Sequence, residues 1–141
     1  VADLIAELQK TRSNIWWIKD MLPHAELTAM LTQAQLFLCP SVYEPLGIVN
    51  LEAMGCETAV LASRVGGIPE VVAEKETGEL VDYKGDGPAF EAAFSESITR
   101  LMSQPELLKK YGTAGRVRAM SEFGWDAVAA ATIALYHRVI A

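Results

Sequence analysis

The stretch LFLCPSVYEPLGIVNLEAM, residues 36–54, decides the fold of this chain. Its first four residues, LFLC, are apolar and predict a short buried strand. A polar turn follows, in which Pro45 is placed for a first helical residue, because proline has a fixed φ and lacks an N–H that would be unpaired there. From Leu46 to residue 55 the composition suits a helix whose polar members are Asn50 and Glu52. The stretch therefore predicts a strand, a turn and a helix.

A strand that leads through a turn into a helix directs unpaired backbone N–H groups toward one point, which attracts anions and phosphates above all. The sequence predicts that these amides belong to Leu46, Gly47, Ile48 and Val49. Gly47 would let a ligand approach the main chain closely, because glycine has no Cβ. We therefore expect a phosphate-binding site at the start of this helix.

Two carboxylates accompany these amides. Glu44 falls in the turn, whereas Glu52 falls in the helix, four residues after Ile48 and on the same helical face. A carboxylate at this place can hold vicinal hydroxyls, as the acidic residue of a dinucleotide site holds a ribose. The alternative is that Glu44 only complements the helix dipole and that Glu52 is a solvated helix residue.

The same arrangement recurs further along the chain. Residues 58–62, TAVLA, predict a second apolar strand, Gly66 and Gly67 follow it, and Pro69 begins a short helix. If the strands are parallel, both loops open at one edge of the sheet, where ligands sit in open α/β folds. Alone, the glycine pair is more often a plain turn, but its agreement with the first loop favours a ligand loop.

The remaining segments complete an α/β pattern. Apolar spacing in the last helix, which includes Trp125, Val128 and Tyr136, predicts contacts with the core. About four strands alternating with helices indicate a partial, three-layer Rossmann-like parallel sheet with a C-terminal helical tail. The further helices are expected over residues 2–12, 25–34, 89–101, 105–121 and from 124 onward, and the further strands over residues 14–18 and 77–82.

Composition limits the function classes. A chain of 141 residues is enough for one domain, and its net charge of −6 argues against a nucleic-acid partner, which requires a basic surface. We expect no membrane span and no signal peptide, and hence a cytoplasmic protein.

Cys39 and Cys56 are expected to be reduced thiols, and His24 and His137 lie too far apart in the chain to indicate a metal site. Because the chain starts at Val1 and not at Met, we expect a piece of a longer protein.

Three blocks in order resemble one family. CPSVYEPLGIVNLEAMGC, with seven residues between Glu44 and Glu52, is similar to the paired-glutamate motif of family 4 retaining glycosyltransferases of the GT-B fold. ASRVGGIPEVV at residues 62–72 and TGELV at residues 77–81 resemble the next two blocks of that family. The sequence around Glu44 most resembles that of bacterial glycogen synthases of the actinobacterial type, which use ADP-glucose. The resemblance runs from about Ile15 to the end of the chain.

The resemblance implies that residues 1–141 are the nucleotide-sugar-binding C-terminal domain of a glycosyltransferase, truncated at its N-terminal side. Such an enzyme transfers a hexosyl group, here glucose from ADP-glucose or UDP-glucose, to a glucan or other hydroxyl acceptor with retention and without a metal or other cofactor. The residue matching Glu44 is then the catalytic-site carboxylate beside the donor sugar, and the one matching Glu52 binds the ribose. The amides matching Gly47 and Ile48 hold the sugar and the diphosphate, and the loop ending at Met21 passes near the base.

The resemblance also implies parts that this chain lacks. Family members carry an acceptor-binding N-terminal domain, and an Arg and a Lys that neutralise the diphosphate, on segments upstream of this sequence. Lys19 and Arg64 are the nearest cations here, and we interpret both as solvated surface residues. Lys75 and Glu76 replace a more usual Asp-Gly, which affects the turn before Thr77. We expect the fragment alone to bind donor weakly and to be inactive.

Two other function classes stay open. One is a relic or regulatory module that binds the donor nucleotide without turnover, although a relic need not keep both glutamates. The other is an epimerase or a phosphorylase with a similar helix-end phosphate site. A phosphorylase would need a lysine for pyridoxal phosphate, and no lysine stands in a comparable block.

Overall fold

A parallel sheet lies at the centre of the computed structural model, which describes residues 1–140. Its three strands, in the order β1-β2-β3, are β1 (Leu36–Cys39), β2 (Ala59–Ser63) and β3 (Gly78–Val81). Parallel neighbours need crossover connections, and these contain α3 (Ile48–Gly55) and α4 (Ile68–Val71). The loops that follow β1 and β2 therefore leave the sheet at the same edge.

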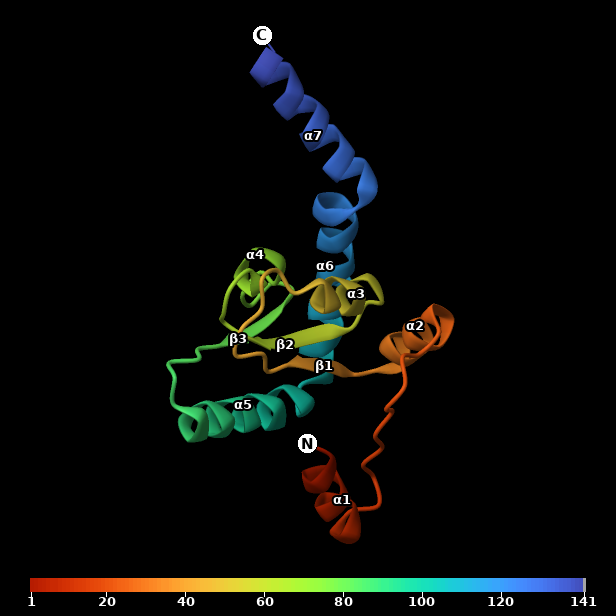
Figure 1. Ribbon diagram of the computed structural model, residues 1–141, viewed down its shortest axis with the longest axis vertical. Helices are drawn as coiled ribbons and strands as arrows, with labels where there is room; N and C mark the ends of the chain where they lie inside the picture. Colours follow the sequence, from red (N-terminus) through yellow and green to blue (C-terminus); the bar gives the residue numbers. More distant parts are fainter. Residues whose placement is uncertain (141) are drawn as a thin grey trace.

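Helices cover both faces of this sheet. In Figure 1, α5 (Gly87–Met102) lies on one side, and α3 and α4 lie on the other. Side chains of β2 alternate between the two layers: Val60 packs with Met54 of α3, whereas Leu61 packs with Phe90 and Phe94 of α5. All of β2 is buried, as expected for the middle strand of a sheet covered on both faces. The α/β fold class is thus confirmed. The other helices that complete these layers are α2 (His24–Gln33) and α6 (Pro105–Phe123).

The predicted strand at residues 14–18 is wrong. Within residues 1–140 this segment pairs with no strand, and it runs as extended chain between α1 (Ala2–Thr11) and α2 (Figure 1). Trp16 is 80% exposed, and the amide of Gln9 ties the segment back to α1 by donating to the carbonyl of Ile15 at 2.9 Å. Aromatic and β-branched composition favours a strand only where a partner and a packing face are present.

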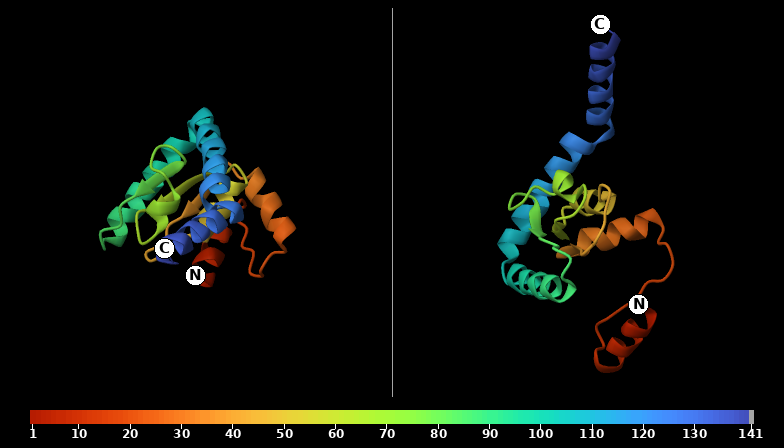
Figure 2. Two further views of the ribbon diagram at one scale, coloured as in Figure 1. Left: turned by 90° about the horizontal axis from the view of Figure 1, so that it is seen from above. Right: turned by 60° about the vertical axis from the view of Figure 1, so that its left-hand side comes forward.

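The C-terminal helical tail is present, but its predicted core contacts are not. Helix α7 (Trp125–Ile140) extends away from the sheet (Figure 1, Figure 2), and none of its residues is buried. Trp125 and Val139 are 88% and 78% exposed. The apolar stripe correctly marks one face of a helix, but within residues 1–140 no element covers that face.

Two further properties concern the described residues as a whole. None of the helices over residues 1–140 has the length and apolar character that crossing a membrane requires. Cys39 and Cys56 are both free thiols, as the sequence predicts, and Cys39 is buried at the end of β1.

Candidate functional site

Helix α3 begins later than predicted. Its first residue is Ile48, and Gly47 is the N-cap residue with φ 90° and ψ 49°, so Pro45 and Leu46 belong to the preceding turn. This left-handed conformation suits glycine and strains residues that carry a Cβ. No side chain caps the helix, and the N–H groups of Ile48 and Val49 lack helical partners. The expected anion-attracting helix start is therefore present, displaced by two to three residues.

The two glycine-containing loops lie against each other. The N–H of Gly67 donates to the carbonyl of Glu44 at 3.1 Å. A Cβ on Gly66 would lie 1.8 Å from that same oxygen, and a Cβ on Gly67 would lie 2.3 Å from the carbonyl of Pro45. Only residues without side chains allow this approach. Gly66 and Gly67 thus support the main chain of the Glu44 turn, a role that the sequence pattern did not reveal.

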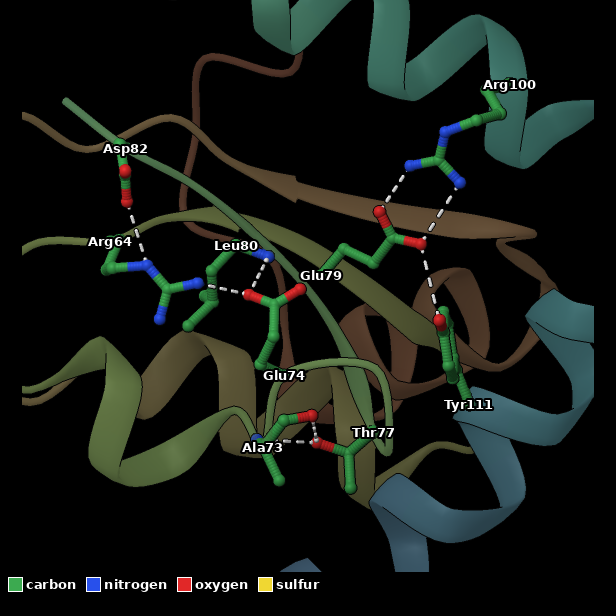
Figure 3. Close-up of polar contacts among 9 residues, drawn as sticks. All are labelled: Arg64, Ala73, Glu74, Thr77, Glu79, Leu80, Asp82, Arg100 and Tyr111. Carbon is green, nitrogen blue, oxygen red and sulfur yellow. Dashed lines mark hydrogen bonds and ion pairs between the residues drawn. The ribbon is translucent and has the colours of Figure 1, made fainter.

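Arg64 anchors the glycine loop from its other end. Its Nε donates to Asp82 at 2.9 Å and its Nη2 donates to Glu74 (Figure 3). Its main-chain N–H donates to the carbonyl of Val81 at 2.8 Å. The carboxylate of Glu74 also accepts from the N–H of Leu80 at 3.2 Å. Arg64 is a surface residue, as predicted, with a side chain that is 41% exposed, but its guanidinium is also paired with the carboxylates of Glu74 and Asp82 on either side of β3. The other candidate cation, Lys19, lies 4.8 Å from the centre of the Trp17 ring.

A buried hydroxyl ties β2 to the turn after β1. Ser63, the last residue of β2, is buried, and its Oγ lies between two main-chain carbonyls. It donates to the carbonyl of Ser41, with the carbonyl of Cys39 also within 3.4 Å. A serine at a strand end carries no pattern of its own, so the sequence did not single it out.

The two glutamates occupy different parts of the unit. Glu44 is half-buried, and its Cγ lies 3.5 Å from the point that a Cβ on Gly47 would occupy. Glu52 is exposed, one turn into α3, where it lines a cavity of about 190 Å³ beside α2. The other residues that line this cavity are His24, Leu27, Thr28, Leu31 and Cys56.

The other residues predicted to bind a ligand lie around the start of α3 or before α2. Met21 is 98% exposed in the segment that precedes α2. Ile48, Val49 and Leu46 are partly exposed around the helix start, whereas Gly47 is buried. Among residues 1–140, no three His, Cys, Asp or Glu side chains gather in a way that could hold a metal ion.

A second polar cluster fastens α5 and α6 to the sheet. Arg100 of α5 donates through Nη1 to Glu79 of β3 at 3.1 Å, and the hydroxyl of Tyr111 from α6 donates to the same carboxylate at 3.3 Å (Figure 3). Burial, together with the negative charge of Glu79, raises the pKa of Tyr111 above its ordinary value. The hydrogen bond to Glu79 raises the pKa of Arg100. We assign this cluster to the stability of the fold.

Comparison with known proteins decides the family. The sequence model described as "Glycosyl transferases group 1" matches residues 3–118. This chain belongs to the group 1 glycosyltransferase family. The family assignment drawn from the three sequence blocks is confirmed, and so is the GT-B fold, because sucrose-phosphate synthase from Thermosynechococcus elongatus superimposes with a TM-score of 0.81 and 31% identity. That superposition covers 99% of this chain and 33% of the synthase.

Curated relatives cover the chain almost completely. Alpha-maltose-1-phosphate synthase from Mycolicibacterium smegmatis is 47% identical over 142 residues, which is 100% of this chain and 37% of the relative. Glycogen synthase from Mycobacterium tuberculosis is 34% identical over 115 residues, which is 82% of this chain and 27% of the relative. This glycosyltransferase chain therefore spans between about a quarter and little more than a third of the length of these relatives.

Proposed function

We propose that the protein containing this chain transfers a glucosyl group from ADP-glucose or UDP-glucose to a glucan or other hydroxyl acceptor, with retention of configuration. Residues 1–141 supply its nucleotide-sugar-binding C-terminal domain. The observation that carries the proposal is the approach of the glycine loop to Glu44, directly beside the uncapped start of α3. The main chain of Glu44 is held there, next to the free N–H groups of the helix start, and a sugar joined to a diphosphate needs both a carboxylate and such donors.

In this proposal, the start of α3 stabilises the negative charge of the leaving group. When the bond between the anomeric carbon and the diphosphate oxygen breaks, negative charge develops on the nucleoside diphosphate. The N–H groups of Gly47, Ile48 and Val49, with Leu46 beside them, stabilise that charge without reorganising. Gly66 and Gly67 support the main chain of the Glu44 turn beside this helix start. The Arg and Lys expected upstream would complete the neutralisation.

The two carboxylates and the exposed segment before α2 contact the sugar, ribose and base of the donor. Glu44 is the catalytic-site residue that contacts the hydroxyls of the glucosyl group. Glu52 binds the ribose hydroxyls as a hydrogen-bond acceptor. The segment ending at Met21 lies beside the base. No metal or other cofactor takes part in this proposal.

The acceptor belongs to a second part of the same protein in this proposal. The name of the Mycolicibacterium smegmatis relative states that it synthesises α-maltose 1-phosphate. Joining a glucosyl group to a hydroxyl of glucose 1-phosphate gives that product, with the acceptor proton leaving alongside the nucleoside diphosphate. Glucose 1-phosphate is therefore tested beside a glucan. A cytoplasmic location belongs to the same proposal, and the free thiols of Cys39 and Cys56 support it.

The test is turnover by the full-length protein. ADP-glucose and UDP-glucose are each supplied with glycogen or with glucose 1-phosphate, and released nucleoside diphosphate and the α-linked product are measured. We expect release with one donor and one acceptor, and none from residues 1–141 alone. Nucleotide binding by the full-length protein without turnover on any pair would contradict the proposal and favour a binding module. Turnover by the isolated fragment would contradict its expected inactivity.

A further inference from the structure

Asn50 is a fully buried amide without a hydrogen-bond partner. Its side chain has 0% exposure, and neither its Nδ2 nor its Oδ1 is paired. Buried side-chain amides are nearly always hydrogen-bonded, because an unmade bond inside a protein destabilises it. An orphaned amide in the first turn of α3, under the predicted donor site, is an exception that calls for a functional partner.

The surroundings of Asn50 show which partner is within reach. Its Nδ2 lies 2.5 Å from the point that a Cβ on Gly47 would occupy. The Cγ of Glu44 and the Cγ1 of Ile68 lie 3.5 Å and 3.3 Å from that point. The amide therefore lies directly beneath the Glu44 turn and against the Gly47 peptide. Since Gly47 has no Cβ, the amide already lies in contact with the Gly47 main chain, and a small rotation of the side chain or of this peptide brings the two within hydrogen-bonding reach.

We propose that Asn50 is a positioning residue, whose amide hydrogen-bonds the main chain of residues 44–47 when the donor is bound and so fixes Glu44 against α3. Asn50 is the third helical residue after the N-cap, and the side-chain atom nearest to Gly47 is the donor Nδ2, so its partner is a main-chain carbonyl of the turn, and the N–H of Gly47 stays free for the diphosphate. Asparagine is one methylene shorter than glutamine, so the bond forms only after a small local adjustment of the peptides at the N-cap. A diphosphate held by the N–H groups of Gly47 and Ile48 aligns these peptides and so favours that adjustment.

The coupling works in both directions. If donor binding helps Asn50 to pair, then Asn50 strengthens donor binding by the same factor. Asn50 is too deeply buried to touch the donor, so its effect reaches the ligand through Gly47 and Glu44. This inference rests on the proposed function, because it assigns a role at the same donor site.

Asn50→Leu and Asn50→Gln in the full-length protein test the coupling. Leucine fills the same space without polar atoms, and glutamine reaches the N-cap without movement of the turn. ADP and UDP affinity are measured by calorimetry, and melting temperature is measured without nucleotide. We expect Asn50→Leu to melt at or above the wild-type temperature and to bind nucleotide about tenfold more weakly. We expect Asn50→Gln to keep affinity within about threefold of wild type.

Gly55→Ala is the control within α3, because a Cβ there meets no atom within 4 Å, and it should leave affinity unchanged. Should Asn50→Leu fold poorly, Asn50→Ala replaces it in the same comparison. Unchanged affinity in a folded Leu or Ala variant overturns the inference and leaves the proposed function intact. A lower melting temperature with unchanged affinity assigns Asn50 to packing alone and overturns it too. Absence of nucleotide binding by the wild type overturns both.

Discussion

The N–H of Gly67 donates to the carbonyl of Glu44 at 3.1 Å, so the loop after β2 holds the turn after β1 through main-chain atoms. The two residues lie on different crossover connections of the sheet. Their contact needs no particular side chain at residue 44 and tolerates none at residue 67. The carboxylate of Glu44 is thus left free of this contact while its backbone is fixed.

Gly67→Ala tests this contact. The added Cβ would lie 2.3 Å from the carbonyl of Pro45 and 2.8 Å from the Cα of Leu46, so the Glu44 turn must move. We expect a loss of about 1–3 kcal/mol in the free energy of unfolding, measured with urea, together with weaker donor binding. Gly87→Ala is the control, because its Cβ meets nothing within 4 Å. Wild-type stability and affinity in Gly67→Ala would show that the contact is not needed.

Arg64→Met tests the anchor of the glycine loop. Because its side chain is 41% exposed, its ion pairs with Glu74 and Asp82 are screened, and their loss should lower stability by about 1 kcal/mol or less. Freed from β3, the loop should hold Glu44 less well, so kcat/KM of the full-length protein should fall at least tenfold. Arg116→Met, which breaks a similarly exposed pair with Glu57 at the far end of α3, should leave kcat/KM near wild type. Equal losses in both variants would contradict the positioning role.

Lys75→Gly should stabilise the fold. Lys75 has φ 62° in the turn before β3, where its N–H donates to the carbonyl of Gly78 at 2.8 Å. A left-handed conformation costs a residue with a Cβ about 1–2 kcal/mol, and glycine avoids this cost. Part of the gain is lost, because glycine also gives the unfolded chain more conformational entropy. We expect a net gain of about 0.5–1 kcal/mol in urea unfolding. Lys84→Gly changes a loop residue that has no positive φ and should give no gain. An equal gain there would show that the positive φ of Lys75 is not the source of the stabilisation.

Alkaline unfolding should report on Tyr111. The folded protein favours the neutral phenol and raises its pKa above 10.0, so this contribution to stability is complete below that pH. It is lost as the pH rises through the pKa of the folded state, because the unfolded chain releases the proton first. Tyr111→Phe should cost about 1 kcal/mol at neutral pH through its lost hydrogen bond to Glu79.

The diagnostic observation is the slope with pH. Between about pH 9 and pH 11, the unfolding free energy of wild type should fall more steeply than that of Tyr111→Phe. Both proteins share all other titrating groups, so the difference isolates this phenol. Parallel curves would mean that the folded protein does not perturb Tyr111.

Local sequence patterns predicted the sheet well and the site only in outline. Short apolar runs bounded by turn residues mark β1 and β2, and TGELVD marks β3. All of β2 is buried, whereas β1, predicted to be a buried strand, buries only Cys39, because it lies at an edge of the sheet. Residues 14–18 have the same composition but lack a partner in the described chain, and composition does not encode pairing. The stripe on α7 likewise shows which face is apolar and not what covers it.

At the site, the backbone conformation of Gly47 decides where the helix begins, and not the preference of proline for a first helical position. Pro45 suits a helix start, but the left-handed φ of Gly47 sets the start of α3 at Ile48. The supports of the Glu44 turn could not be predicted, since they join residues far apart in sequence. Ser63 reaches the carbonyl of Ser41 across 22 positions, and Asn50 is significant only because its amide is buried and unpaired.

The most direct test of the donor site is calorimetric titration of the full-length protein with ADP and with UDP, in wild type and in Glu52→Ala. Hydrogen bonds from ribose hydroxyls to a carboxylate contribute about 1.5–3 kcal/mol, so we predict heat of binding in wild type and affinity roughly tenfold to a hundredfold weaker in the variant. Glu106→Ala, at the start of α6, is the control and should bind like wild type. No heat with either nucleotide in wild type, or equal affinity in Glu52→Ala, would contradict the account.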